Sequence, residues 1–252
     1  MVRYKLTLAY DGSDFVGSQR QASKRTVQGE LEKALQKLGW SGRSVIISGR
    51  TDTGVHATGQ VASVDLDWSD TEEHLARALN SLLPPDIAAK SARVVDNNFH
   101  PRFDAVSRLY RYGLFCQSLR DPIRERFDWR VWPAINADDL INVAKLFLGT
   151  HDFSAFGSPT TPKGTTVRTV MKAEWQRVNK DEWHFEVQAD AFLYRMVRRL
   201  VFVQVAVAQG KTPVATVANS LAKPPPAGTR SGLPSGLAPA YGLTLVEVKY
   251  KE

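Results

Sequence analysis

The first half of the chain alternates between strand-like and helix-like hydrophobic patterns. Apolar and polar residues alternate from Arg3 to Tyr10, which predicts a strand, and residues 26–38 carry an apolar stripe with the spacing of an amphipathic helix. Asp70 and Glu73 have the spacing of a capping box, which predicts that a second helix opens at Asp70 and ends before Pro84-Pro85. Shorter segments predict further strands, at residues 44–48, 61–67 and 91–95.

The second half has a similar order of elements but no sequence similarity to the first. A strand is predicted over residues 107–116, a helix opens at Asn136, and residues 169–178 and 183–189 predict a hairpin. The remaining predictions are a long helix from Leu193 to Ala208, a helix with Pro213 in its first position, a Pro/Gly/Ser-rich loop over residues 223–240 and a closing strand over residues 243–250. We therefore expect two α+β lobes, residues 1–104 and 105–252.

Composition and charge narrow the class of protein. Of 252 residues, 43% are hydrophobic and 23% charged, which is typical of a globular protein and excludes a largely disordered chain. We find no signal peptide and no apolar run long enough for a membrane helix, and the single cysteine, Cys116, excludes an internal disulfide and a multi-cysteine metal cluster. These features favour a cytoplasmic protein. The 33 basic and 26 acidic residues give a net charge of +7, which favours an anionic partner such as nucleic acid.

The densest cluster of functional residue types spans residues 48–57, between two predicted strands. Asp52 lies there, two residues after Arg50, with glycines on both sides. One interpretation is a structural turn in which Asp52 bonds its own backbone. The other is a carboxylate that a nearby guanidinium keeps ionised as a nucleophile. Asp52-Thr53-Gly54 also matches the triplet of aspartic proteases. That mechanism needs two carboxylates that share a proton, from two triplets in one chain or from one in each subunit of a dimer, whereas this chain has a single copy and Arg50 would oppose the sharing.

Basic and aromatic residues elsewhere have similar alternatives. Arg195 and Arg199, four residues apart in the predicted long helix, form either a solvated face or a phosphate-binding face. Tyr110 is either a core residue or a side chain that stacks on a base. His151-Asp152-Phe153-Ser154 does not have the separation of a catalytic triad, and we expect it to end the preceding helix and to pack. The five histidines lack metal-ligand spacing, and nucleotide-binding motifs are absent, which disfavours metal, ATP and NAD.

Eight short motifs occur in order along the chain. They are Tyr10-Asp11-Gly12, Gly17-x-Gln19-Arg20-Gln21, Thr26-Val27-Gln28-Gly29, Gly49-Arg50-Thr51-Asp52-x-Gly54-Val55-His56-Ala57, Ser107-Arg108-x-Tyr110-Arg111-Tyr112, His151-Asp152-Phe153-Ser154-Ala155-Phe156, Phe192-Leu193-Tyr194-x-Met196-Val197-Arg198-Arg199 and Ala238-Pro239-x-x-Gly242-Leu243. Together they resemble the tRNA pseudouridine synthase A family across essentially the whole chain.

The resemblance implies a fold and an activity. The fold would be the pseudouridine synthase fold: an α+β protein with two similar α/β lobes around a central, mostly antiparallel sheet and a cleft between the lobes. The activity would be conversion of uridine to pseudouridine in the tRNA anticodon stem-loop, at positions 38, 39 and 40, by a homodimer without cofactor or metal. A non-catalytic tRNA-binding protein on the same scaffold is the alternative from another class.

The resemblance also implies roles for individual residues. Asp52 matches the catalytic aspartate, Arg50 the basic residue of its loop, and Arg198 the arginine that pairs with the aspartate. Tyr110 matches the tyrosine that stacks on the target base, and Leu243 matches an apolar wall of the pocket. Further RNA contacts are expected from Arg20, Arg108, Arg195 and Arg199. The sequence leaves open whether Asp52 attacks the base or assists at C1′, and which group removes the C5 proton.

The chain also departs from the family pattern. Ser18 stands where tryptophan is common, Thr53 replaces a common alanine, Arg195 a frequent histidine and Phe202 a frequent glycine. We expect these changes to leave the matched chemical groups intact. Ser18 and Arg195 could alter the RNA contacts and, with them, the range of substrates.

Overall fold

The computed structural model describes residues 1–161, 164–223 and 232–251. Contacts within the chain define two compact units. Unit 1 comprises Met1–Val106 and the C-terminal strand from Thr244, and unit 2 comprises Ser107–Leu243. The division into domains at residue 104 stays a prediction. The C-terminal strand, from Thr244, belongs to unit 1, because it pairs with a strand of the N-terminal residues.

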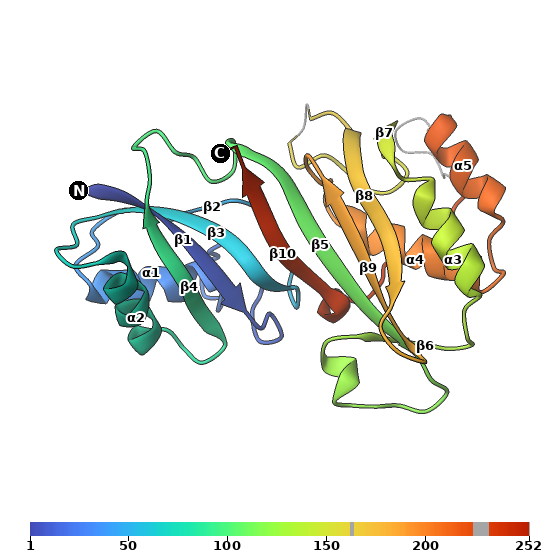
Figure 1. The fold of residues 1–252 in the computed structure, drawn as a ribbon, viewed down its shortest axis with the longest axis horizontal. Helices are drawn as coiled ribbons and strands as arrows, with labels where there is room; N and C mark the ends of the chain where they lie inside the picture. Colours follow the sequence, from blue (N-terminus) through green and yellow to red (C-terminus); the bar gives the residue numbers. More distant parts are fainter. Residues whose placement is uncertain (162–163, 224–231, 252) are drawn as a thin grey trace. The chain divides into compact units, whose positions relative to one another are not determined.

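Among its described residues, unit 1 contains two helices and five strands, which are labelled in Figure 1. Three of the strands lie in the order β4-β1-β3 and pair antiparallel, while β10 runs parallel to β3 and β2 pairs antiparallel with it. In chain order the elements are β1 (Val2–Tyr10), α1 (Val27–Lys37), β2 (Ile46–Ile47), β3 (His56–Leu66), α2 (Glu72–Leu82), β4 (Ile87–Val94) and β10 (Leu243–Tyr250).

The alternation predicted for β1 is confirmed, because its even-numbered residues from Tyr4 to Tyr10 are buried and the intervening residues are partly exposed. Helix α1 begins as expected after Thr26, whose hydroxyl accepts from the Gly29 N–H at 3.2 Å. The predicted opening of α2 is wrong by one residue. The cap is Thr71, which accepts from the His74 N–H, and Asp70 lies outside the helix, where it accepts from the Thr71 N–H at 2.6 Å.

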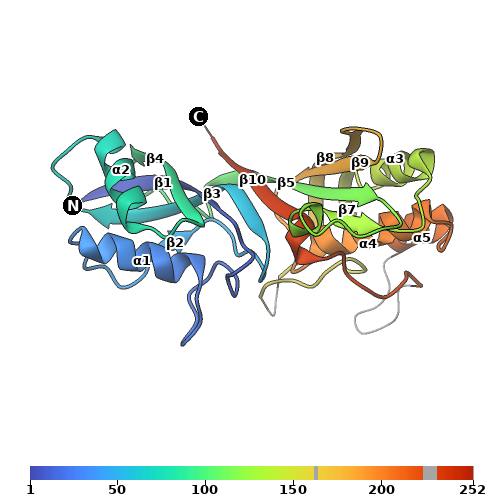
Figure 2. The same cartoon turned by 90° about the horizontal axis from the view of Figure 1, so that it is seen from below.

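The described part of unit 2 consists of a second set of strands with three α-helices. Strands β5, β9, β8 and β7 pair antiparallel in that order, and β6 runs parallel to β5. Figures 1 and 2 show α4 along one face of these strands. In chain order the elements are β5 (Ala105–Cys116), η1 (Arg124–Arg126), β6 (Trp129–Val131), α3 (Ala137–Lys145), β7 (Gly149–Asp152), β8 (Val167–Arg177), β9 (Glu182–Ala189), α4 (Met196–Ala208), α5 (Val214–Ala222) and η2 (Ala240–Gly242).

The predicted α+β class with a mostly antiparallel sheet is confirmed, but two helix starts in unit 2 differ from the predictions. Helix α4 begins at Met196, because Tyr194 forms a β-bridge with Ser158 and Arg195 adopts a left-handed backbone conformation with φ 61°. Arg195 therefore does not share a helical face with Arg199. Pro213 is the cap of α5 and not its first helical residue. Residues 224–231 of the predicted loop lie outside the described residues.

The His151–Phe156 motif packs as expected, although its first part forms a strand. Phe153 and Phe156 are buried beside Phe147, with ring centroids 5.4–6.4 Å apart. His151 and Asp152 belong to β7 and do not end the preceding helix. Within the described part of the chain, none of the helices combines the length and apolar character needed to cross a membrane.

Candidate active site

Asp52 lies in a loop of unit 1 that joins the short strand β2 to the long strand β3. We call residues 48–55 the aspartate loop. The side chain of Asp52 is half-buried and that of Arg50 is exposed, whereas Ser48 and Thr51 on the same loop are buried. The loop closes on itself through the Val55 N–H, which donates to the Asp52 carbonyl at 3.1 Å. The backbone therefore turns at Asp52, and a bond from the Asp52 carboxylate to its own backbone stays a prediction.

A fully buried amide on β3 holds the beginning of the aspartate loop. Gln60 is 0% exposed, and its Nε2 donates to the Gly49 carbonyl at 2.9 Å. Its Oε1 accepts from the Ser48 hydroxyl at 2.7 Å. The second Nε2 hydrogen reaches the Tyr10 hydroxyl at 3.4 Å. Because a buried amide is costly unless it is hydrogen-bonded, this network strongly favours one conformation of the loop.

The end of β1 supplies the next support. The Tyr10 hydroxyl lies 2.9 Å from the hydroxyl of Thr51, the residue that precedes Asp52 in the chain. The Tyr10 ring is buried. Burial raises the pKa of the Tyr10 phenol, while hydrogen bonds with Thr51 and Gln60 act in the opposite direction. The phenol is therefore neutral at physiological pH and acts here as a structural hydrogen-bonding group.

Two glycines allow other segments of unit 1 to approach the aspartate loop. A Cβ on Gly12 would lie 2.0 Å from the Val55 carbonyl oxygen, a distance that no side chain tolerates. Gly17 has a φ of +79°, and a Cβ there would lie 3.0 Å from the Thr51 carbonyl oxygen. The glycines of the Tyr10-Asp11-Gly12 and Gly17-x-Gln19-Arg20-Gln21 motifs are thus explained by the close packing of backbones around the loop.

Ser18 makes the most direct contact with the residue before Asp52. Its hydroxyl accepts from the Thr51 N–H at 2.8 Å, and its own N–H donates to the Thr51 carbonyl at 3.1 Å. Ser18 is 1% exposed, so its side chain is directed into unit 1. The sequence indicated Ser18 only as a departure from the family pattern, and nothing in the sequence connects it to Thr51.

Tyr110 and Arg198, the predicted partners of Asp52, lie in unit 2. Tyr110 is on β5, paired with Val187 on β9, and its ring meets the edge of Phe192 at a centroid distance of 5.1 Å. Arg198 lies in the first turn of α4, and its Nε donates to the Ala238 carbonyl at 2.8 Å. The Ala238 N–H donates back to the Arg198 carbonyl at 3.1 Å. These contacts connect the first turn of α4 to the segment that leads to Leu243.

Leu243 is the first residue of β10 and is 6% exposed. The segment before it is held by Tyr112, which is buried and whose hydroxyl donates to the Pro239 carbonyl at 2.9 Å. Gly242 lies so close to the Tyr112 ring that a Cβ would come within 2.6 Å of it. These contacts hold Leu243 near Tyr112. Tyr112 lies on β5, two residues after Tyr110. The convergence of this group with Asp52 and Arg50 stays a prediction.

The other predicted RNA contacts differ in how their guanidinium groups are engaged. Arg20 pairs with the buried Glu32 at 2.8 Å, and Arg108 donates to the Asp190 carbonyl at 2.8 Å. Arg199 donates to the carbonyls of Pro234 and Gly236, and burial lowers the pKa of its guanidinium. Arg195 is exposed and stacks over the Tyr194 ring at 4.7 Å.

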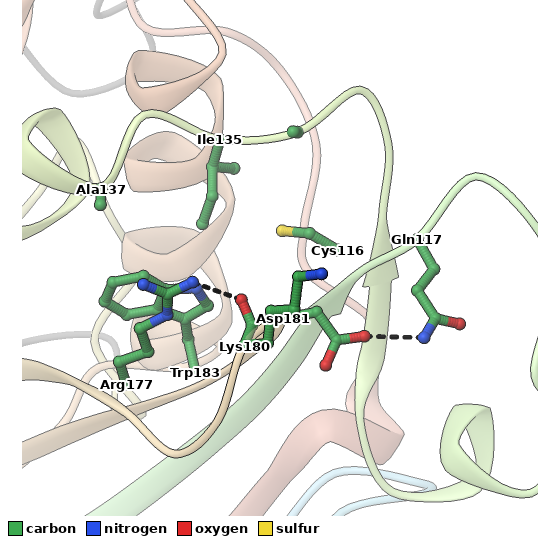
Figure 3. A pocket seen from close by; sticks show the side chains of 9 residues that line it. Cys116, Gln117, Ile135, Ala137, Arg177, Lys180, Asp181 and Trp183 are labelled. Atoms are coloured by element: carbon green, nitrogen blue, oxygen red, sulfur yellow. Dashed lines mark hydrogen bonds between the residues drawn. The ribbon is translucent and has the colours of Figure 1, made fainter.

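A separate pocket of about 580 Å³ lies in unit 2 at the β8–β9 hairpin (Figure 3). Two hydrogen bonds run along its wall: Asp181 accepts from Gln117 at 2.7 Å, and Arg177 donates to the Lys180 carbonyl. Burial raises the pKa of the Cys116 thiol at its edge. None of the predicted site residues lines this pocket. Among the described residues, no group of three or more histidine, cysteine or carboxylate side chains has an arrangement that could hold a metal ion.

The chain is similar to proteins of known family. A family model described as tRNA pseudouridine synthase matches residues 7–104 and 143–251. The tRNA pseudouridine synthase A of Bacillus subtilis strain 168 is 39% identical over 252 residues, which are 99% of each chain. That of Solidesulfovibrio magneticus is 41% identical over 256 residues, 99% of this chain and 92% of the relative. A solved archaeal box H/ACA sRNP Nop10-Cbf5 complex shares 11% identity, with a TM-score of 0.39 over 80% of this chain and 44% of that one, which is too low to support an inference.

Proposed function

Because the chain belongs to the tRNA pseudouridine synthase family, an isomerase family, we propose that it converts uridine to pseudouridine at positions 38, 39 and 40 of the tRNA anticodon stem-loop, with Asp52 as its catalytic nucleophile and without a cofactor. The observation that carries this proposal is the support around Asp52. The residues of the aspartate loop on both sides of Asp52 are bonded to or packed against Tyr10 of β1, Gln60 of β3 and the Gly17–Ser18 turn, while Asp52 itself remains half-buried rather than enclosed.

The reaction itself needs few chemical groups. The N1–C1′ glycosidic bond breaks, the uracil turns, C5 bonds to C1′, and C5 loses its proton while N1 gains one, either directly or through solvent. Atoms and electrons balance without an oxidant, a hydrolytic water or a phosphate donor. A carboxylate can serve either as a nucleophile that adds to the base or as a group that assists departure of the base from C1′. Both routes require Asp52 to be ionised and held in place.

The predicted pocket residues have complementary roles in this proposal. Arg198 would keep Asp52 ionised, because a nearby guanidinium stabilises a carboxylate. Tyr110 would stack on the uracil, and Leu243 would exclude water from its other side. The target uridine must leave its stack to reach these groups, at a cost of a few kcal/mol. Arg50 would contribute positive charge beside the displaced nucleotide.

Binding of tRNA would depend on the excess of basic side chains. The net charge of +7 favours contact with backbone phosphates, and such contacts weaken as salt rises. Of the four further arginines expected to meet RNA, Arg195 is the one best placed, because it is exposed and stacks on Tyr194. Arg20 is also exposed but pairs with Glu32, and Arg199 and Arg108 bond carbonyls of unit 2. A homodimer in the cytoplasm is part of the proposal on the strength of the family resemblance.

The test is Asp52→Asn in the full chain, with unmodified tRNA carrying tritium at uridine C5. We expect tritium release by the wild type, no release by the variant, and a tRNA Kd that is unchanged. Asp67→Asn, an exposed carboxylate at the end of β3, is the control and should release tritium normally. Release by Asp52→Asn at the wild-type rate would remove Asp52 from the mechanism. Tight tRNA binding without release by the wild type would favour the non-catalytic binder.

A further inference from the structure

Ser18 stands out among the buried polar residues of unit 1, because two of its polar groups bond the aspartate loop and the third bonds α1. Its hydroxyl and its N–H bond the N–H and the carbonyl of Thr51 at 2.8 and 3.1 Å. Its carbonyl accepts from the Gln28 N–H at 2.9 Å. Ser18 therefore connects the residue before Asp52 to the first turn of α1.

The contact with α1 gives the Ser18 backbone a rigid foundation. N–H groups in the first turn of a helix have no partner within the helix, so the bond from Gln28 satisfies one of them. The Gln28 side chain is itself bonded to Glu32 at 2.9 Å and to the Val45 carbonyl at 3.0 Å. This buried network leaves the Ser18 backbone little freedom to follow a displaced Thr51.

The hydroxyl of Ser18 controls the orientation of one particular peptide group. The Thr51 N–H belongs to the peptide that joins Arg50 to Thr51, and Thr51 is 7% exposed. Without an acceptor this N–H would be buried and unsatisfied, so the peptide would turn toward water or admit one. Either change rotates the backbone directly before Asp52 and moves its carboxylate.

We propose that Ser18 is a positioning residue for the reaction, whose hydroxyl sets the orientation of the Thr51 peptide and thereby the place of the Asp52 carboxylate. The inference rests on the proposed function, because it assumes that Asp52 is the nucleophile. Ser18 touches neither substrate nor the reacting atoms in this role. Its loss should therefore slow the chemical step without weakening the grip on tRNA.

The experiment compares Ser18→Ala, Ser18→Cys and Ser18→Thr in the full chain. Single-turnover tritium release at saturating enzyme gives the rate of the chemical step, and filter binding gives the Kd for tRNA. We expect Ser18→Ala to lower the rate about 10-fold or more, because displacements of about 1 Å reduce rates by up to about 100-fold. Its Kd should stay within about twofold, since the Ser18 side chain is buried and cannot reach a phosphate. Ser18→Cys fills the same space with a weak acceptor and should behave in the same way.

Two comparisons separate positioning from general destabilisation. Ser18→Thr keeps the hydroxyl and should restore most of the rate. Ser220→Ala removes a similarly buried hydroxyl, which bonds the Thr216 carbonyl at 2.8 Å on α5, and should leave the rate unchanged at equal folded fraction. The inference is overturned if folded Ser18→Ala and Ser18→Cys retain the wild-type rate, or if their loss lies only in Kd. If the wild type itself makes no pseudouridine, the proposed function fails, and the inference fails with it.

Discussion

The sharpest consequence of the backbone packing around Asp52 concerns Gly12. Its Cβ, if present, would lie 2.0 Å from the Val55 carbonyl oxygen and 2.5 Å from the carbonyl carbon. Real Cβ atoms essentially never come closer than 3.0 Å to another heavy atom, so in Gly12→Ala the two backbones must separate by about 1 Å. Neither partner is a flexible side chain that could turn away.

This displacement should reach Asp52. Val55 is tied to Asp52 by a hydrogen bond of 3.1 Å across the turn, and Thr51 is held at the other side by Ser18 and Tyr10. The turn must therefore deform between two fixed points. A misplacement of about 1 Å reduces catalytic rates by up to about 100-fold. Overpacking of this kind also costs about 1–3 kcal/mol of stability.

The assay is single-turnover tritium release at saturating enzyme, with urea unfolding of the same preparations. Gly12→Ala should lose about 30- to 100-fold in rate at a temperature where it remains folded. Gly42→Ala is the matched control, because its Cβ would meet the Trp40 indole at 2.6 Å near the end of α1, outside the aspartate loop. It should lose stability but keep its rate per folded molecule. A wild-type rate in folded Gly12→Ala, or an equal loss of rate in both variants, would refute the reasoning.

Three further outcomes are expected. Tyr10→Phe removes a buried hydroxyl and should lower the free energy of unfolding by about 1–3 kcal/mol in urea; an unchanged value would contradict the role of that hydroxyl. Burial alone would raise the pKa of Glu186, but hydrogen bonds from Lys172 and Arg111 bring it below the ordinary 4.5. This carboxylate therefore stabilises the fold above pH 4.5, and that stability is lost as the pH falls through the lowered pKa. Glu186→Gln should therefore weaken the dependence of the urea midpoint on pH below pH 4.5. An unchanged dependence would argue against this role of Glu186. Arg195→Ala should reduce the slope of log Kd for tRNA against log salt by about 1, whereas Arg199→Ala should leave that slope unchanged and lower stability.

Local sequence signals predicted the elements well where one residue type has one physical role. The alternation of β1 follows from one buried face, and Thr26 caps α1 because its hydroxyl meets an unpaired N–H. The same signal was ambiguous at α2, where Asp70 and Thr71 are both capping residues and only the backbone path decides between them. At α4 the helical periodicity continued through residues 193–195, but pairing of Tyr194 with Ser158 overrides it. Such a pairing depends on a segment 36 residues away and leaves no local trace.

The residues of the candidate site also differ in whether the sequence alone could identify them. Asp52 could be found from the sequence, because a carboxylate between glycines and beside arginine is an unusual cluster. Gln60 and Ser18 could not, since a polar residue inside a strand or before a helix reads as exposed until its partners are known. Arg199 was grouped with the RNA contacts by its spacing, yet it bonds the carbonyls of Pro234 and Gly236. Which basic side chain meets RNA depends on tertiary contacts that compete for the guanidinium.

The aspartate loop also explains why chemistry and RNA affinity should respond to different substitutions. Gln60 uses both its amide hydrogens and its oxygen on Gly49, Tyr10 and Ser48, so any change in the loop leaves at least one buried polar group without its partner. The loop therefore has one well-defined conformation and few acceptable alternatives. In the proposed function, contacts to phosphate would be made by separate, exposed side chains, each of modest value and screened by salt. Substitutions in the buried network should change the rate at constant affinity, and substitutions of exposed arginines should change affinity at constant rate.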